Sequence, residues 1–202
     1  MIISMSDIIC VTARNLCEGD FLQQIEKIAA ASPDRIILRE KDLPESDYHV
    51  LAEEVINICR KYDTTLMLHY YWRTSIELDC KNIHLPLHIL RELSADEKGS
   101  FECIGVSCHS VDDAVEAQKL GANYITSGHI FATDCKKGLA PRGLDFLREV
   151  CESVDIPVYA IGGISPNNIE HVRECGAAGG CVMSGFMKCN APLQYIRKFE
   201  KK

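Results

Sequence analysis

The chain has 202 residues, a length that suits one domain with a full hydrophobic core. Its net charge is −7 and it has no long run of lysine and arginine, which excludes a typical nucleic-acid-binding protein. No apolar stretch reaches the ~20 residues that cross a bilayer, and the N-terminus lacks the basic segment and cleavage site of a signal peptide. We therefore expect one cytoplasmic domain over residues 1–202, with no nucleic-acid and no membrane partner.

Short β-rich runs alternate with amphipathic stretches along the whole chain. In the first half this pattern predicts strands at residues 8–12, 35–39, 65–69 and 82–85, and helices at residues 21–31, 47–62 and 74–79. In the second half it predicts strands at residues 103–107, 124–127, 157–161 and 180–183, and helices at residues 111–120, 144–153, 167–175 and 193–202. Gly121 and Gly176 each follow a helix as a C-terminal stop.

Strands that alternate with helices in this way predict a parallel α/β sheet. A doubly wound open sheet is the alternative to a closed barrel. Eight strands are the number that a (β/α)₈ TIM barrel requires, and no G-x-G-x-x-G segment follows the first strand. We therefore expect a TIM barrel, whose functional groups lie on the loops after the strands.

Two glycine-containing turns follow the last two predicted strands. Gly162 and Gly163 follow the seventh strand, and Ser184 and Gly185 follow the eighth. TIM barrels often bind phosphate at these two loops, where glycine lets main-chain N–H groups approach the oxyanion. The alternative is that the glycines only form tight turns. Because both turns lie where the barrel rule places a phosphate, we favour phosphate binding.

His109 lies at the end of the fifth predicted strand, where its imidazole could accept and return a proton. By position alone, a solvent-facing role beside a helix N-cap is equally consistent. Arg39 and Lys41 lie two residues apart, so their side chains share one face and could bind an anion together. Salt bridges to Glu40 or Asp42 are the alternative for this pair.

A metal site has little support in the sequence. His84 and His88 are four residues apart, but Pro86 interrupts the segment and His84 belongs to a strand. We interpret His129 as a loop-packing residue. The eleven cysteines are scattered without a C-x-x-C pair, so we expect most of them to be small buried hydrophobic residues.

Several segments together resemble the thiamin phosphate synthase/TenI superfamily. Residues 128–138 resemble its G-x-x-F-x-T-x-x-K-x-G loop, and residues 105–110 resemble its G-x-S-x-H-S segment. Residues 160–164 and 182–185 resemble its phosphate-binding turns, and residues 38–41 resemble the R-E-K of the synthases. The sequence Thr-Asp-Cys-Lys-Lys-Gly within the first segment is most similar to that of TenI-type thiazole tautomerases, which share the barrel fold.

Resemblance to the tautomerases implies an isomerase that aromatises a thiazole carboxylate phosphate without a metal or cofactor. Its catalytic histidine corresponds to His109, which would move a proton from a ring carbon to an exocyclic carbon. The phosphate would bind at the two glycine turns, and Arg39, Lys41 or Lys136 would bind the carboxylate. We add Ser107 and Thr133 to the predicted substrate-binding residues, and we expect a homo-oligomer with a small phosphorylated thiazole-type substrate.

The synthases of the superfamily couple a pyrimidine diphosphate to a thiazole phosphate and use Mg²⁺. Their metal carboxylates come from an Asn-Asp pair and a further Asp, and these positions read His69, Tyr70 and Ile89 here, which are poor ligands for Mg²⁺. This departure argues against the synthase reaction, although Arg39 and Lys41 are retained. A third possibility is a regulatory protein that binds the phosphate ligand without chemistry. The bulky residues 69–72 could narrow the barrel mouth or stack on a ring.

Overall fold

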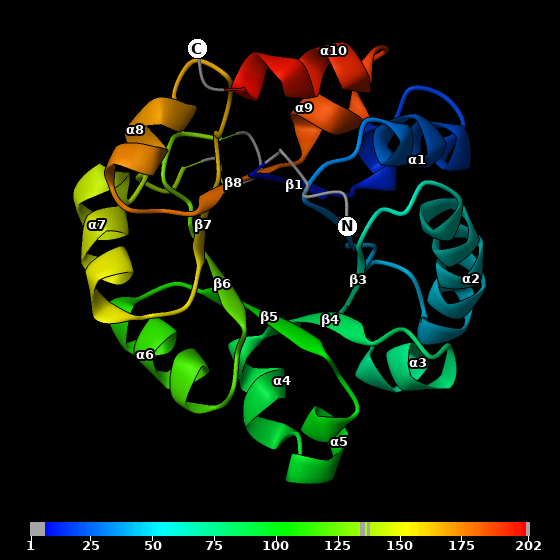
Figure 1. Cartoon of the computed structure of the whole chain (residues 1–202), viewed down its shortest axis with the longest axis horizontal. Coiled ribbons are helices and arrows are strands. Elements are labelled where there is room, and N and C mark those ends of the chain that lie inside the picture. Colours follow the sequence, from blue (N-terminus) through cyan, green and yellow to red (C-terminus); the bar gives the residue numbers. More distant parts are fainter. Residues whose placement is uncertain (1–6, 134–135, 137, 201–202) are drawn as a thin grey trace. The chain divides into compact units, whose positions relative to one another are not determined.

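The structure is a computed structural model that describes residues 7–133, 136 and 138–200. Its eight parallel strands form a closed barrel in the sequential order β1 to β8 (Figure 1). This order confirms the predicted (β/α)₈ fold class. The chain divides into two compact units, Met1–Ile83 with Val182–Lys202 (unit 1) and His84–Cys181 (unit 2), and the predicted single domain stays a prediction.

Unit 1 contains three parallel strands whose residues are almost all buried. This explains why its strands appear in the sequence as continuous apolar runs. Cys10 pairs with Ile36, and Ile36 pairs with Leu66. The elements are β1 (Ile8–Val11), η1 (Arg14–Leu16), α1 (Phe21–Ala30), β2 (Arg35–Leu38), α2 (Glu45–Lys61), β3 (Leu66–His69), α3 (Trp72–Glu77), α9 (Ser184–Met187), α10 (Pro192–Ile196) and η3 (Arg197–Phe199).

Unit 2 contains a run of parallel strands with helices on their outer side (Figure 1). Val106 pairs with Ile125, and Ile125 pairs with Val158. The elements are β4 (Asn82–Pro86), which enters the unit at His84, α4 (Leu87–Glu92), α5 (Ala95–Gly99), β5 (Cys103–Cys108), α6 (Val111–Lys119), β6 (Tyr124–Gly128), α7 (Gly143–Ser153), β7 (Val158–Ile161), α8 (Ile169–Glu174) and β8 (Gly179–Val182), which leaves the unit after Cys181.

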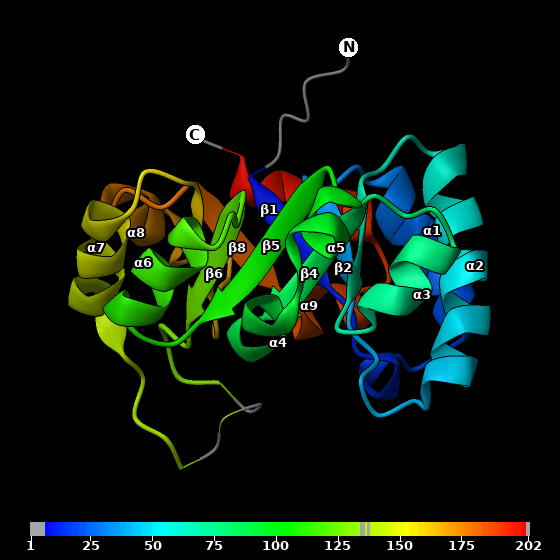
Figure 2. The same cartoon turned by 90° about the horizontal axis from the view of Figure 1, so that it is seen from below.

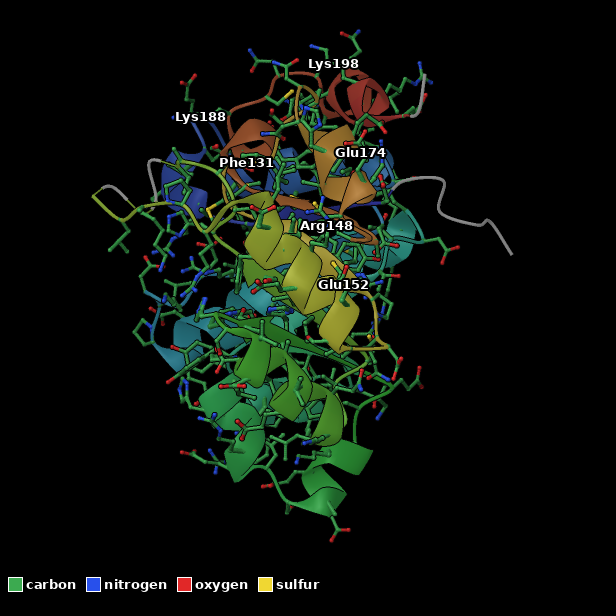
Figure 3. The ribbon with its side chains drawn as sticks, turned by 90° about the vertical axis from the view of Figure 1, so that its left-hand side faces the viewer. Phe131, Arg148, Glu152, Glu174, Lys188 and Lys198 are labelled. Atoms are coloured by element: carbon green, nitrogen blue, oxygen red, sulfur yellow. The ribbon has the colours of Figure 1, made fainter. Side chains whose placement is uncertain are left out.

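The helices of unit 2 separate apolar and charged side chains on opposite faces. On α7, Leu147 and Val150 are buried. Arg148 and Glu152 lie on the exposed face of the same helix (Figure 3). This 3.6-residue periodicity is the pattern from which the helix was predicted.

Some boundaries differ from the sequence-based expectations. The helices α4 and α5 were not predicted, although α5 begins with a capping box between Ser94 and Glu97. The helix α3 begins at Trp72, two residues before the predicted start. The predicted helix 193–202 is instead α10 followed by η3, which ends at Phe199, and residues 201–202 lie outside the described part.

The ten described cysteines are all buried or half-buried and none forms a disulfide; Cys135 lies outside the described residues. Burial raises the pKa of Cys59 and of Cys108 to about 12. These thiols therefore stay protonated and act as small apolar groups, as expected. Among the described residues, the structure has no helix whose length and apolar character would let it cross a membrane.

Candidate active site

A buried carboxylate organises the ends of β1 and β2 in unit 1. Glu40 is 2% exposed and accepts a hydrogen bond of 2.6 Å from the hydroxyl of Thr12. Both of its carboxylate oxygens also accept from the backbone N–H of Arg14, at 3.1 and 3.0 Å. Burial raises the pKa of Glu40, although these contacts and the Arg14 charge oppose the shift. Two strand ends are thereby tied together through one side chain.

Arg14 forms ion pairs with Glu40 and Asp42, the two carboxylates that the sequence offered as partners for Arg39 and Lys41. Its guanidinium contacts Glu40 at 3.4 Å and Asp42 at 2.8 Å, and it lowers the pKa of Asp42. Both carboxylates beside the predicted anion-binding pair therefore have Arg14 as an ion-pair partner. The backbone N–H of Arg39 donates to the hydroxyl of Thr12 at 2.9 Å, which fixes the chain where Arg39 leaves β2. Anion binding by Arg39 and Lys41 stays a prediction.

The aromatic segment after β3 is held by tyrosine hydroxyls. The buried hydroxyl of Tyr48 accepts from the backbone N–H of His69 and donates to the carbonyl of Leu38, both at 2.8 Å. Tyr71 donates to the carbonyl of Leu43 at 2.6 Å. Tyr70 has a backbone φ of +73°, a conformation that costs energy for any residue with a Cβ. These hydrogen bonds hold the bulky aromatic segment in place within unit 1.

The turn after β8 begins the short helix α9. A Cβ added to Gly185 would lie 2.1 Å from the hydroxyl oxygen of Tyr195, so this position requires glycine for space. The side-chain amide of Gln24 donates to the carbonyls of Phe186 and Cys189, at 2.7 and 2.8 Å. Packing within unit 1 thus explains Gly185, and the phosphate role of Ser184 and Gly185 stays a prediction.

In unit 2, His109 follows β5 immediately and is exposed. Its backbone N–H donates to the carboxylate of Asp113 at 2.8 Å, while Ser110 caps α6. Its ring Nδ1 lies 3.4 Å from the carbonyl oxygen of Gly128, at the end of β6. A carbonyl oxygen only accepts, so a hydrogen bond here places the proton on Nδ1 and leaves the lone pair on Nε2. This tautomer suits a general base.

Ser107, a predicted substrate-binding residue, belongs to a buried polar cluster in unit 2. His84 is 3% exposed; its Nε2 lies 2.9 Å from the hydroxyl oxygen of Ser107, and its Nδ1 lies 2.9 Å from that of Tyr124. The hydroxyl of Thr126 donates to that of Ser107 at 3.4 Å. His84 therefore has hydrogen-bond partners on both ring nitrogens, and this cluster could not be recognised from the spacing of His84 and His88.

The turn after β7 packs closely against the chain that follows β6. Gly162 has a φ of +96°, and a Cβ added there would lie 2.3 Å from the Cβ of His129. The backbone N–H of Phe131 donates to the carbonyl of Gly162 at 3.0 Å. A Cβ on Gly163 would lie 2.6 Å from the carbonyl oxygen of Ala132. Packing therefore requires both glycines, and their phosphate role stays a prediction.

The described residues 129–133 and 138–142, between β6 and α7, extend beyond the arrowhead of β5, on the side where the strands end (Figure 2). His129 lies at the start of this connection, with Nε2 3.4 Å from the carbonyl oxygen of Leu139, as expected for a loop-packing residue. The backbone N–H of Lys136 donates to the carbonyl of Thr133 at 3.1 Å. Asp134, Cys135 and Lys137, which belong to the segment of family resemblance, lie outside the described residues.

The donors present do not fit a magnesium site. Over the described ranges, no group of three or more histidine, cysteine, aspartate and glutamate side chains is placed to hold an ion. His69 is the last residue of β3, Tyr70 follows it, and Ile89 lies in α4. Mg²⁺ prefers carboxylate, carbonyl and water oxygens, which these side chains do not supply.

Comparison with known proteins gives consistent matches over most of the chain. The TMP-TENI family model, described as thiamine monophosphate synthase, matches residues 8–186. A putative thiamine-phosphate synthase 2 of Aquifex aeolicus is 33% identical over 178 residues, which cover 88% of this chain and 96% of that protein. A thiamine-phosphate synthase of Clostridium tetani is 30% identical over 180 residues, which cover 86% of this chain and 84% of that protein.

Among solved structures, a thiamine phosphate pyrophosphorylase from Pyrococcus furiosus is similar to this chain, with a TM-score of 0.82 and 24% sequence identity. The match covers 97% of this chain and 94% of the other. At this identity the structural similarity supports the barrel fold alone.

Proposed function

Since the chain belongs to the thiamine monophosphate synthase family, we propose that it is an enzyme of thiamine biosynthesis that aromatises a thiazole carboxylate phosphate by moving one proton. In this reaction the C–H bond at a ring carbon breaks and a C–H bond at an exocyclic carbon forms. The double bond moves into the ring, so that no oxidant or reductant is needed. The substrate is a small phosphorylated heterocycle, and the protein acts as a homo-oligomer in the cytoplasm.

One observation carries this proposal. The Nδ1 atom of His109 lies 3.4 Å from the carbonyl oxygen of Gly128, which leaves Nε2 as the basic nitrogen. His109 accepts the proton from the ring carbon at Nε2 and returns it to the exocyclic carbon. A histidine serves as both base and acid near neutral pH because its ordinary pKa is about 6.5.

The other predicted residues bind the substrate. The main-chain amides of Gly162 and Gly163 are assigned to the phosphate from the sequence, and Ser184 and Gly185 have the same predicted role. The substrate carboxylate meets Arg39, Lys41 or Lys136. Thr133 and Ser107 complete the predicted binding residues. None of these roles uses a metal ion or an organic cofactor.

The names of the relatives favour a second candidate, the coupling of a pyrimidine diphosphate to a thiazole phosphate. Both the Aquifex aeolicus and the Clostridium tetani relatives are named as thiamine-phosphate synthases, and these names support the coupling reaction better than the tautomerase. Against it stand His69, Tyr70 and Ile89, which do not supply the oxygen ligands for Mg²⁺. A tautomerase with His109 as its base agrees better with the residues of this chain.

The deciding experiment incubates the full chain with the non-aromatic thiazole carboxylate phosphate and follows ring aromatisation by absorbance, with and without a metal chelator. We expect turnover that the chelator does not change and that His109→Ala reduces by at least about 10²-fold. His171→Ala is the matched control, since His171 is exposed on α8 and lies 3.3 Å from Glu174. Absence of aromatisation by the wild-type protein would refute the tautomerase proposal.

A parallel reaction tests the second candidate. The chain is incubated with the pyrimidine diphosphate, the thiazole phosphate and Mg²⁺, and thiamine phosphate is measured. Product formation that requires Mg²⁺ would establish the synthase. Binding of the thiazole phosphate without turnover in either reaction would indicate a non-catalytic ligand-binding protein.

A further inference from the structure

The polar cluster around His84 consists of side chains from three strands of unit 2. His84 lies on β4, Ser107 on β5, and Tyr124 and Thr126 on β6. Tyr124 is 2% exposed, and its ring lies directly over Gly105, where an added Cβ would be 2.2 to 2.4 Å from ring atoms. Its hydroxyl is thus held in place by packing, at 2.9 Å from Nδ1 of His84.

The chemistry of the groups decides the direction of these hydrogen bonds. A phenol is more acidic than an aliphatic alcohol, so it is the stronger donor and the weaker acceptor. Tyr124 therefore donates to Nδ1 of His84, and the ring proton must lie on Nε2. The Nε2–H group then donates to the hydroxyl oxygen of Ser107 over 2.9 Å. Hydrogen bonds arranged in such a chain strengthen one another.

The hydroxyl of Ser107 is left with one direction in which to donate. Its oxygen accepts from His84 and, at 3.4 Å, from Thr126. Two accepted hydrogen bonds use both lone pairs of a hydroxyl, so the Ser107 proton points away from His84 and Thr126. Ser107 lies on β5 and His109 follows the last residue of that strand, so both side chains come from the same strand end. Ser107 is half-buried, as a group at the edge of a binding site would be.

We infer that Tyr124, His84 and Ser107 form a one-directional hydrogen-bond relay that makes the Ser107 hydroxyl a fixed donor to the substrate. This inference rests on the proposed function, because its last link needs the substrate of His109. When His109 removes the ring proton, negative charge spreads over the ring and its carboxylate until the proton is returned. A donor aimed at that charge stabilises it without reorganisation. His84, Tyr124 and Thr126 are positioning residues that act through Ser107.

The relay is first tested without substrate. Nitrogen-15 NMR of the full chain at about pH 8, where histidine is ordinarily neutral, reports which ring nitrogen of His84 is protonated. Loss of the signals in His84→Gln assigns them. We expect protonation at Nε2 and a lone pair at Nδ1, and in Tyr124→Phe a mixture of both tautomers. A wild-type His84 that is protonated at Nδ1 would overturn the relay.

The link to the substrate is tested by a double-mutant cycle on the aromatisation rate. We expect Ser107→Ala to lower kcat by roughly 10²-fold, as for the loss of one oxyanion donor, and His84→Ala to lower it by about tenfold. KM should change much less than kcat. In the Ser107→Ala background, His84→Ala should have almost no further effect. His84→Gln should recover much of the rate, because its amide can donate near the position of Nε2.

The outcomes separate this inference from the proposed function. If His84→Ala lowers kcat as much in the Ser107→Ala variant as it does in the wild-type protein, His84 does not act through Ser107. That result would overturn the link to the substrate, whatever the NMR shows. If the wild-type protein does not aromatise the substrate, the proposed function and the substrate link fail together, while the NMR result still decides the relay. Should His84→Ala fail to fold, Tyr124→Phe replaces it in the cycle, with an expected loss of about threefold in kcat.

Discussion

The carboxylate of Glu40 accepts a hydrogen bond of 2.6 Å from the hydroxyl of Thr12, across the ends of the paired strands β1 and β2. The same carboxylate accepts from the backbone N–H of Arg14. Burial is the largest influence on Glu40 and raises its pKa above the ordinary value of 4.5. The folded chain therefore holds this proton more tightly than the unfolded chain does, and ionisation of Glu40 costs stability.

Because the pKa of Glu40 is raised in the folded state, the effect of Glu40→Gln on stability should depend on pH. The cost of ionisation is absent below a pH of about 4.5 and complete above the raised pKa of the folded state. As pH rises through this window, the wild-type protein should lose stability relative to the variant. Urea unfolding of both proteins at several pH values from about 4 to about 7 measures the difference. Glu54→Gln, at an exposed site on α2, controls for the loss of charge. A stability difference that moves the other way with pH contradicts the prediction.

The barrel was predictable because strands buried on both faces leave short, continuous apolar runs in the sequence. The helices α4 and α5 were missed, although the Ser94 and Glu97 pair of α5 is a recognisable capping signal. The position of His109 after β5 follows from the strand pattern alone. The contact between His84 and Ser107 depends on how strands align, and spacing along one chain does not determine that alignment.

The relay of unit 2 needs the space above Gly105. In Gly105→Ala the new methyl group would overlap the Tyr124 ring, whose nearest atom lies 2.2 Å from the added Cβ. We expect Tyr124 to be displaced from His84 and the protein to lose about 1–3 kcal/mol of stability, as for other overpacked cores. Chemical denaturation measures the loss, and nitrogen-15 NMR detects the changed His84 tautomer. Gly99→Ala is the control, since nothing lies within 4 Å of its added Cβ. Unchanged His84 signals in Gly105→Ala would contradict this account.

Ser127 on β6 has a fully buried hydroxyl whose oxygen has no hydrogen-bond partner among the described residues. An unsatisfied buried hydroxyl costs about 1–3 kcal/mol. We therefore expect Ser127→Ala to raise the free energy of unfolding by about 1 kcal/mol. Ser75 provides a matched control, because it is equally buried and donates to the carbonyl of Cys80 at 2.9 Å. Ser75→Ala should destabilise the fold, and equal effects of the two substitutions in urea unfolding would contradict the assignment.

Alanine substitutions at Gly162 and Gly121 distinguish the stability cost of a strained backbone from the stability cost of a steric clash. Their φ angles are nearly equal, +96° and +97°, but only the added Cβ of Gly162 meets another residue, at 2.3 Å from His129. Alanine at Gly121 should cost about 1–2 kcal/mol from its positive φ alone. Alanine at Gly162 should cost about 1–3 kcal/mol more, because it also forces His129 away. Urea unfolding of both variants measures this difference. If phosphate binds at this turn, Gly162→Ala should also weaken the binding of inorganic phosphate, measured by calorimetry, while Gly121→Ala leaves it unchanged. Equal stability losses in the two variants would show that the turn has room for a side chain.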